Sequence, residues 1–407
     1  ILGVGGSGMS SIAKYLKQKG DNVIGYDQRK SYVTNLLNQD GIKVTHSLNE
    51  IVYEPDSLYI YSSAIPIKSE IFSNFHDKKN VLSRPEYLKN LSENQKIIGI
   101  TGTHGKTSTT ALLSHIFHFN NLNVSYLYGG ITTFNGIGGH YGDADKPLIL
   151  ETDEAFNTFE KINISDLLVL NVDSDHLDYF KNLDNYKTAF YKVMKNVTDN
   201  LVVNNDDLNI KTMKELKNLV SYGTDISADF KVQSSGIFIY ENNKYEIKTD
   251  IIGDHFKSNM VGAIILALLN GIEISDSLNA IESFAGVKRR IELIGISKGV
   301  SIYDDYGHHP TEMEATITAL KEQTKSKLYV VFQPHRYTRT KEYFNSFKDS
   351  LKLADYAIVT DIYPAGESPI PGLSSKNFEE ESIKYLKSIR YVPEYLSKKV
   401  QNGDIVL

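Results

Sequence analysis

The chain has 407 residues, a length that suggests two or three domains. Of these residues 41% are hydrophobic and 23% charged, which is a composition typical of globular proteins. Its 44 basic and 50 acidic residues give a formal charge of -6, which argues against a protein whose main task is to bind nucleic acid or an anionic membrane. Cysteine is absent, so disulfides, thiolate nucleophiles, iron–sulfur clusters and cysteine-ligated zinc are excluded.

The sequence predicts strands that alternate with helices, a pattern typical of parallel α/β sheets. In chain order we expect a helix at 9–19, strands at 23–26 and 58–61, a polar linker at 90–95, a strand at 97–100, a helix at 108–119 and strands at 148–150 and 167–170. A hairpin within 230–248, with its turn around Asn242-Asn243, and a helix at 259–269 should follow. The same alternation continues with a strand at 300–303, a helix at 312–322, a strand at 328–332, a helix from about 341 to 353 and a strand at 356–359.

The two ends of the sequence suggest a truncated protein. It begins with Ile1 shortly before a glycine loop and ends at 404–407 in what reads as an unfinished strand. No signal peptide is recognisable at the start. The longest apolar stretch, 260–269, is about half of the ~20 residues that a membrane span needs, so we expect no membrane segment.

A phosphate-binding loop is predicted at 101–107, where Thr-Gly-Thr-His-Gly-Lys-Thr lies between a buried strand and a helix. Glycines let backbone N–H groups approach phosphate oxygens, and the helix N-terminus adds positive potential. Lys106 would reach the β- and γ-phosphates, and the Thr107 hydroxyl would bind Mg²⁺. Ile100 stands where the usual pattern has its first glycine, so the loop is a shortened variant.

The first glycine loop of the chain, Gly3–Gly8, satisfies G-x-G-x-x-G between a strand and a helix, and Asp27 follows about twenty residues later. This pattern predicts diphosphate binding at the helix N-terminus. The ligand could be a dinucleotide or a nucleotide-sugar diphosphate. The turn that begins at Ser62 and Ser63 follows another predicted strand and should lie at the same sheet edge.

Acidic and histidine side chains follow two more predicted strands. Glu151–Glu154 comes directly after the strand at 148–150, and Asn171–His176 comes directly after the strand at 167–170. Both groups should project from the edge that carries the phosphate loop, where oxygen ligands favour Mg²⁺. We expect Glu151 and His176 to be the metal-site residues and several of the other acids to cap helices.

The last third of the chain places further polar clusters after two strands. Asp304–Glu312 follows the strand at 300–303, and His335–Arg339 follows the strand at 328–332. Two arginines and a histidine at such positions suit the binding of carboxylates or phosphates.

These motifs, in this order, resemble the Mur ligase family over nearly the whole chain. The residues that carry the resemblance are Gly3–Ser10, Ser62–Ile65, Gly102–Thr107, Glu151–Glu154, Asn171–His176, Lys288–Glu292, Asp304–Glu312 and Gln333–Arg339. The resemblance implies an α/β fold of three domains: a Rossmann-like UDP-sugar-binding domain at 1–93, a central P-loop ATPase-type parallel sheet at 94–285, and a Rossmann-like amino-acid-binding domain at 286–407 that we expect to be truncated.

The activity implied by the resemblance is an ATP-dependent amide ligation in cytoplasmic peptidoglycan precursor synthesis. UDP-N-acetylmuramate and L-alanine would be joined through an acyl phosphate, with ATP and Mg²⁺ as cofactors. We expect a monomer or weak homodimer with no nucleic-acid or membrane partner.

The resemblance also assigns residues to roles. The implied ATP contacts are Gly102, Thr103, Gly105, Lys106, Thr107, Ser108, His255, Asn259, Arg290 and Asp305. The implied substrate contacts are Gly5, Gly6, Ser7, Gly8, Asp27, Ser62, Ser63, Arg84, His104 and Tyr306. The implied Mg²⁺ ligands are Thr107, Glu151 and His176, and the implied catalytic residues are Lys106, His308, Arg336 and Arg339. For His308, accepting a proton and positioning a substrate are both open.

Several positions depart from the family pattern. Phe156 replaces an aspartate, Phe256 replaces an amide, and Ile291 replaces a phenylalanine. Phe190 stands where some relatives carry a carbamylated lysine, so we do not expect that modification.

Three other functions stay open. Phe156 and Phe256 motivate a catalytically silent nucleotide-binding regulator. The loop Gly3–Gly8 together with Asp27 motivates a dinucleotide-dependent oxidoreductase. A murein-tripeptide ligase of cell-wall recycling is a fourth reading, against which the segment Pro334–Arg339 argues.

Overall fold

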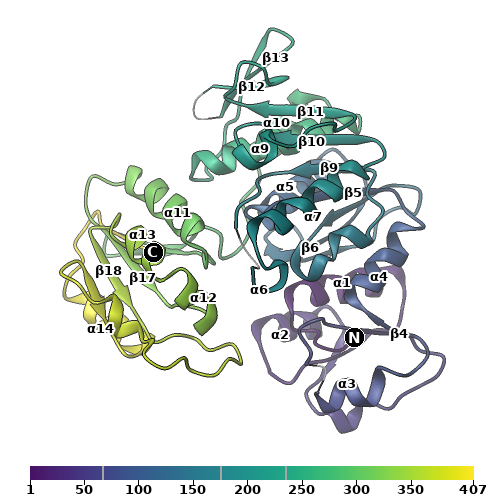
Figure 1. Ribbon diagram of the computed structural model, residues 1–407, viewed down its shortest axis with the longest axis horizontal. Helices are drawn as coiled ribbons and strands as arrows, with labels where there is room; N and C mark the ends of the chain where they lie inside the picture. Colours follow the sequence, from purple (N-terminus) through teal and green to yellow (C-terminus); the bar gives the residue numbers. More distant parts are fainter. Residues whose placement is uncertain (67, 175–176, 234–235) are drawn as a thin grey trace. The chain divides into compact units, whose positions relative to one another are not determined.

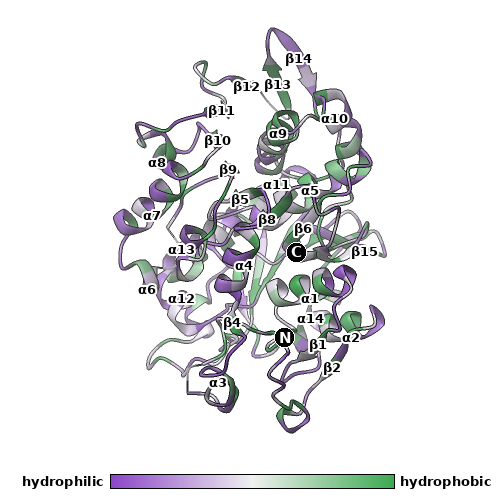
Figure 2. Ribbon diagram, turned by 90° about the vertical axis from the view of Figure 1, so that its right-hand side faces the viewer, coloured by the Kyte–Doolittle hydropathy of each residue, from purple (hydrophilic) through white to green (hydrophobic). Residues whose placement is uncertain are grey.

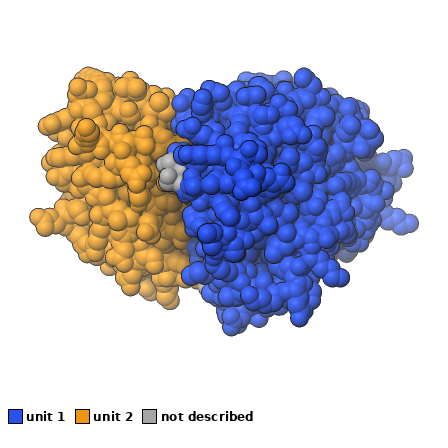
Figure 3. Space-filling view, turned by 90° about the horizontal axis from the view of Figure 1, so that it is seen from above, with its two compact units in different colours: residues 1–250, 257–287 blue, residues 251–256, 288–407 orange. Residues whose placement is uncertain are grey.

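The computed structural model in Figure 1 describes residues 1–407 except 67, 175–176 and 234–235, and except the side chains of 156, 177 and 178. The chain divides into two compact units, residues 1–250 with 257–287 and residues 251–256 with 288–407 (Figure 3). Each unit is an α/β structure with a buried apolar core of its own, as the sequence predicts. No helix in the described part of the chain is long and apolar enough to cross a membrane.

The first unit begins with a small parallel arrangement of strands around Leu2, which bridges in parallel to both Tyr26 and Tyr61. Its strands are β1 (Ile24–Tyr26), β2 (Lys43–Thr45), β3 (Tyr59–Tyr61) and β4 (Val81–Ser83). Its helices are α1 (Ser7–Lys19), α2 (Tyr32–Gln39), η1 (Leu48–Glu50), α3 (Glu70–Phe75) and α4 (Arg84–Ser92). Because the strands are parallel, the glycine loop after Leu2 and the turn after β3 lie at the same edge, as predicted.

The main sheet of the first unit has the order β14-β13-β12-β11-β10-β9-β5-β8-β6-β7. Its strands are β5 (Ile97–Thr101), β6 (Ser125–Thr132), β7 (Gly136–His140), β8 (Leu148–Glu151), β9 (Asp166–Val169), β10 (Asn200–Asn204), β11 (Leu219–Gly223), β12 (Phe230–Val232), β13 (Ile237–Tyr240) and β14 (Asn243–Glu246). Strand β5 pairs in parallel with β8 and with β9, and all three are buried. The carboxyl ends of these strands therefore meet at one edge, which confirms the predicted arrangement.

Helices cover this sheet and connect its strands (Figure 1). They are α5 (Lys106–Phe119), η2 (Ala155–Asn157), η3 (Phe159–Lys161), α6 (Leu177–Phe180), α7 (Leu183–Lys195), α8 (Leu208–Lys211), α9 (Asp254–Leu269) and α10 (Ile274–Glu282). Helix α9 carries the apolar run 260–269, whose hydrophobic residues are green in Figure 2, and most of this run is buried. Helix α1 packs closely on the β6–β7 hairpin, since a Cβ on Gly139 would lie 2.0 Å from the Ser11 carbonyl oxygen.

The second unit contains a sheet with the order β15-β16-β20-β17-β18-β19. Its strands are β15 (Glu292–Ser297), β16 (Val300–Asp304), β17 (Leu328–Phe332), β18 (Tyr356–Val359), β19 (Ile383–Tyr385) and β20 (Ile405–Val406). Its helices are α11 (Pro310–Glu322), α12 (Tyr337–Glu342), α13 (Phe344–Leu351), η4 (Ser375–Phe378), η5 (Ile389–Tyr391) and α14 (Val392–Ser397). Strand β20 pairs in parallel with both β16 and β17, so their carboxyl ends share one edge.

Three expectations about local structure need correction. The predicted linker at 90–95 begins inside α4, because Leu88 and Ser92 are buried and continue the helix that Ser83 caps. The single helix predicted at about 341–353 is two helices, α12 and α13, separated by Tyr343. The predicted hairpin is confirmed, but its two turn residues are Glu241 and Asn242, which both have positive φ.

Candidate functional site

The predicted phosphate loop leaves β5 at Thr101 and leads directly into α5 at Lys106. Gly102 and Gly105 have φ of 142° and 84°, which L side chains rarely adopt. A Cβ on Gly102 would also lie 3.1 Å from the backbone of Asn171, so the loop fits only without side chains at this point. The buried hydroxyls of Thr107 and Ser108 follow in the first turn of α5, where backbone N–H groups are available to an anion.

Lys106 is held by a carboxylate that the sequence did not single out. Its Nζ lies 2.9 Å from Oε2 and 3.0 Å from Oε1 of Glu154, whose side chain is only 1% exposed. Nζ also donates to the carbonyl oxygens of Gly102 (2.6 Å) and Thr103 (3.1 Å). Burial disfavours the charged lysine, but the nearby carboxylates outweigh it and raise the pKa of Lys106.

A buried hydrogen-bond network connects Glu154 with the loop that follows β9. The Tyr186 hydroxyl donates to Oε1 of Glu154 (3.2 Å) and lies 2.9 Å from Oγ1 of Thr103. Thr103 Oγ1 in turn accepts from the backbone N–H of Asp173 at 2.8 Å. The network therefore ties the phosphate loop, the acidic segment after β8 and the loop after β9 to one another.

His104 is fixed by residues after β9. Its backbone N–H donates to Oδ1 of Asn171 (2.8 Å), and Nδ2 of Asn171 donates to its carbonyl oxygen (3.0 Å). Its ring Nε2 lies 3.3 Å from Oδ2 of Asp173. The amide and the carboxylate thus set the position of a predicted substrate contact.

Two of the predicted metal ligands lie together. The Thr107 hydroxyl donates to Oε1 of Glu151 at 2.8 Å, and the backbone N–H of Gly129 donates to Oε2 at 2.6 Å. A hydroxyl and a carboxylate beside a phosphate loop are the hard oxygen donors that Mg²⁺ prefers. The third predicted ligand, His176, lies outside the described residues.

The first glycine loop is shaped by Asp27 and by the turn after β3. Oδ2 of Asp27 accepts from the backbone N–H of Gly5 at 2.9 Å. The backbone N–H of Gly6 donates to the carbonyl oxygen of Gly3 at 3.1 Å, so two of the predicted phosphate donors already have internal acceptors. Gly6 caps α1, which begins at Ser7. A Cβ on Gly3 would lie 3.0 Å from Cβ of Ser62, which places the predicted turn against the loop; Ser63 beside it is exposed.

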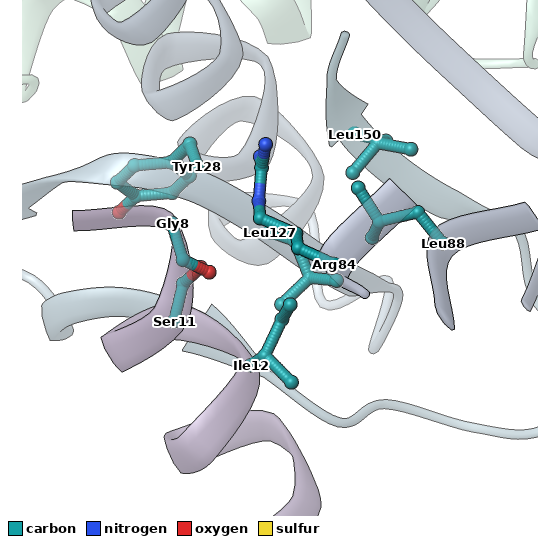
Figure 4. Close-up of a pocket in the computed structure, with 8 residues that line it drawn as sticks. All are labelled: Gly8, Ser11, Ile12, Arg84, Leu88, Leu127, Tyr128 and Leu150. Atoms are coloured by element: carbon teal, nitrogen blue, oxygen red, sulfur yellow. The ribbon is translucent and has the colours of Figure 1, made fainter. Parts of the chain in front are cut away.

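Arg84 lies against the start of α1. A Cβ on Gly8 would come within 2.7 Å of Nε of Arg84, and this buried nitrogen has no hydrogen-bond partner among the described residues. The two residues line a pocket together with Ser11, Ile12, Leu88, Leu127, Tyr128 and Leu150 (Figure 4). The guanidinium beside the helix N-terminus gives this end of α1 a positive potential.

In the second unit, Asp305 organises the segment after β16. Its carboxylate accepts from the backbone N–H groups of Ile291 (2.9 Å) and Gly307 (2.7 Å), and burial raises its pKa. The guanidinium groups of Arg289 and Arg290 each lie 5.3 Å from the ring of Tyr306, which is exposed. Two cations on one aromatic ring concentrate positive charge beside this loop.

His308 follows in the same segment. Its Nδ1 lies 3.1 Å from the carbonyl oxygen of Tyr306 and 3.4 Å from Oε2 of Glu312. Because a carbonyl oxygen only accepts, Nδ1 carries the proton and Nε2 keeps the lone pair in the neutral ring. Burial lowers the pKa of His308 to about 4, and the charges of Arg339 and Arg290 act in the same direction.

Arg336 has a left-handed backbone, with φ of 69°, and precedes α12, which carries Arg339. Its Nε donates to Oε1 of Glu367 at 2.6 Å. His255 lies in the first turn of α9, beside the ring of Phe256.

Phe256 packs against the core of the second unit, which gives this departure from the family pattern a structural role. The side chain of Asn259 adjoins the phosphate loop, since a Cβ on Gly105 would lie 2.5 Å from its Nδ2. Phe190 is buried in the core of the first unit, and the side chain of Phe156 lies outside the described part of the chain.

We expect the substitution Glu154→Gln to destabilise the ligand-free protein by about 3–5 kcal/mol, because it leaves the buried Lys106 ammonium without its counter-charge. Chemical denaturation measures the difference. Glu160→Gln, a change of the same chemistry at a partly exposed position of the same unit, is the control and should have little effect. Equal stability of the two variants would show that Glu154 does not hold Lys106.

We also expect His308 to remain neutral between pH 6 and 8. NMR titration of histidine-labelled protein, with His308→Gln used to assign the signal, measures its pKa. The folded value of about 4 lies below the ordinary value of 6.5, so the neutral ring stabilises the fold above about pH 6.5. That contribution is lost as the pH falls from 6.5 toward 4. A midpoint between 6 and 7 would contradict the burial of this ring.

Family models and known proteins are similar to this chain along its length. Family models match at residues 1–96 (Mur ligase family, catalytic domain), 100–267 (Mur ligase middle domain) and 289–407 (Mur ligase, glutamate ligase domain). The UDP-N-acetylmuramate–L-alanine ligase of Caldicellulosiruptor saccharolyticus is 35% identical over 429 residues, covering 100% of this chain and 94% of the relative. The protein of the same name from Dictyoglomus turgidum is 35% identical over 396 residues, covering 94% and 85%.

Solved structures show the same fold. The UDP-N-acetylmuramate-alanine ligase of Thermotoga maritima has a TM-score of 0.83 at 23% identity, and the match covers 100% of this chain and 94% of that one. A murein peptide ligase from Psychrobacter arcticus has a TM-score of 0.70 at 21% identity, with the same coverage. The matched domains and the full-length relatives together show that this chain belongs to the Mur ligase family.

Proposed function

We propose that this chain is an ATP-dependent ligase that joins L-alanine to the carboxylate of UDP-N-acetylmuramate in the cytoplasm. The observation that carries the proposal is the phosphate loop at the end of β5, where Lys106 forms an ion pair with Glu154 and the Thr107 hydroxyl donates to Glu151. The full-length relatives, which are named UDP-N-acetylmuramate–L-alanine ligases, support the choice of substrates. We retain the division into a UDP-sugar domain at 1–93, an ATP domain at 94–285 and an amino-acid domain at 286–407.

The first step is phosphorylation of the sugar's carboxylate. A carboxylate becomes a good acyl donor once it is phosphorylated, but its attack on the γ-phosphate of ATP brings negative charges together. Lys106 would neutralise part of that charge, and to do so it must exchange the carboxylate of Glu154 for phosphate oxygens. The charged state of Lys106 is thus prepared before ATP arrives.

The oxygen donors of Thr107 and Glu151 fit a magnesium ion. When bound, Mg²⁺ would neutralise phosphate charge and help to orient the γ-phosphate. The residues of the chain contribute the hydroxyl and carboxylate that hold it, and the Gly129 N–H keeps that carboxylate oriented. His176 would complete the set.

The sugar diphosphate would bind at the first glycine loop. The backbone N–H groups of Ser7 and Gly8 lie at the start of α1, and Arg84 lies beside them. The unpartnered Nε of Arg84 supports this assignment, because a buried guanidinium nitrogen without an acceptor in the described residues could donate a hydrogen bond to an anionic ligand.

The second step is attack of the alanine amine on the acyl phosphate, which expels phosphate. We assign the acceptor-side roles to Tyr306, His308, Arg336 and Arg339. Neutral His308 has a lone pair on Nε2 and could take the proton that the amine loses. The arginines would bind the carboxylate of alanine or the acyl phosphate.

The direct test is a coupled assay of phosphate release from Mg-ATP with UDP-N-acetylmuramate and L-alanine. We expect release that requires both substrates, and loss of at least ~100-fold in the variant Lys106→Met, because the γ-phosphate loses its charge partner.

Parallel reactions separate the other functions. Replacing L-alanine by the tripeptide tests the recycling ligase, and NAD(P) binding tests the oxidoreductase. Nucleotide binding without phosphate release would contradict the proposal and favour a silent regulator.

A further inference from the structure

The segment that follows β18 is hydrogen-bonded to the segment that follows β17, beyond the ends of both strands. The backbone N–H of Tyr363 donates to the carbonyl oxygen of Pro334, and that of Arg336 donates to the carbonyl oxygen of Tyr363, both at 2.8 Å. The rings of His335 and Tyr363 stack with centroids 5.5 Å apart. The two segments therefore continue the parallel ladder and hold each other in register.

A tight turn then directs Glu367 back toward Arg336. Ala365 and Gly366 both have positive φ, 48° and 90°, and the N–H of Glu367 donates to the carbonyl oxygen of Pro364 at 2.9 Å. A non-glycine residue at such an angle is uncommon, so the turn adopts a conformation that local sequence preference alone would not select.

The carboxylate of Glu367 accepts three hydrogen bonds from one short segment. Oε1 accepts from Nε of Arg336 (2.6 Å) and from the hydroxyl of Thr338 (2.7 Å), and Oε2 accepts from the backbone N–H of Thr338 (3.0 Å). Burial opposes ionisation, but these hydrogen bonds outweigh it and hold the pKa of Glu367 at about 2. The carboxylate is therefore ionised at any pH at which the enzyme would be assayed.

We infer that Glu367 is a positioning residue that orients the guanidinium of Arg336 for the acceptor side of the reaction. The inference rests on the proposed function, in which Arg336 binds an anionic group. Thr338 anchors the carboxylate through its N–H and its hydroxyl, and the anchored carboxylate fixes the Nε edge of the guanidinium. A guanidinium held in one plane loses less conformational freedom when it binds a carboxylate or phosphate.

An ordinary surface ion pair is the alternative, and such pairs contribute little to stability. This pair differs in three respects. The side chain of Glu367 is only 19% exposed, the same carboxylate binds a helix N–H, and Arg336 adopts a left-handed backbone beside it. A contact that serves only stability would affect every substrate equally, which makes the two roles separable.

The test is the substitution Glu367→Gln, which keeps the shape but turns one acceptor oxygen into a donor that faces other donors. We expect kcat/KM for L-alanine to fall by about 10–100-fold, as misplacement of a binding group does. The Kd for ATP should change less than twofold, and the loss should be the same from pH 6 to pH 9.

Glu379→Gln is the matched control, because Glu379 also binds one cation, Lys384 at 2.7 Å, in the same unit. It should behave as the unsubstituted protein. A Glu367→Gln variant as active as this control would overturn the inference, whereas an unsubstituted protein without alanine-dependent phosphate release would overturn the proposed function itself.

A double-mutant cycle shows whether Glu367 acts through Arg336. In an Arg336→Lys background, Glu367→Gln should reduce kcat/KM by less than twofold further, since the guanidinium it orients is gone. A second full loss in that background would overturn the inference. If Glu367→Gln does not fold, Thr338→Val serves in its place, with an expected loss of twofold to fivefold that also disappears in the Arg336→Lys background.

Discussion

The ion pair of Lys106 with Glu154 is the interaction on which the rest of the central site depends. A buried ammonium is unstable without a partner, and here the partner is a carboxylate that is itself buried and bound by Tyr186. The same tyrosine reaches Thr103, so the lysine, its counter-charge and the loop form one network. An incoming phosphate can replace a carboxylate at Lys106 because both are anions with oxygen acceptors.

Glycine residues bring the two predicted phosphate-binding loops of the first unit close to each other. A Cβ on Gly129 would lie 3.1 Å from Oγ of Ser7 in the first loop and 3.5 Å from Oε2 of Glu151 beside the second. The neighbouring Gly130 lies close to Thr107, since a Cβ on Gly130 would lie 2.8 Å from Cγ2 of that threonine. Strand β6 therefore lies between the predicted sugar-diphosphate site and the predicted ATP site. A side chain at Gly129 or Gly130 would push these two sites apart.

The sequence predicted those parts of the fold that have a local signal. Apolar runs identified β5, β8, β9, β17 and β18, and parallel pairing then placed Thr107 and Glu151 at one edge. The position of β20 between β16 and β17 had no such signal, because it depends on pairing across the whole unit. The division of the predicted helix at Tyr343 likewise depends on packing, since its ring contacts His309.

The contacts that the sequence did not reveal join residues far apart in the chain. Tyr186 is 83 residues from Thr103 and 32 from Glu154, and Glu367 is 31 from Arg336. None of these pairs forms a spacing that marks a motif. The acidic run Glu151–Glu154 is visible in the sequence. The turn after β8 decides which of its carboxylates contacts Lys106 and which one contacts Thr107.

The most direct measurement of the central claim follows the oxygen atoms of the acyl donor. UDP-N-acetylmuramate labelled with ¹⁸O in both oxygens of its carboxylate is converted with Mg-ATP and L-alanine, and the released phosphate is analysed by mass spectrometry. If the carboxylate is phosphorylated and the amine then expels phosphate, one ¹⁸O moves into each phosphate and one stays in the amide. Phosphate without the label would contradict the account.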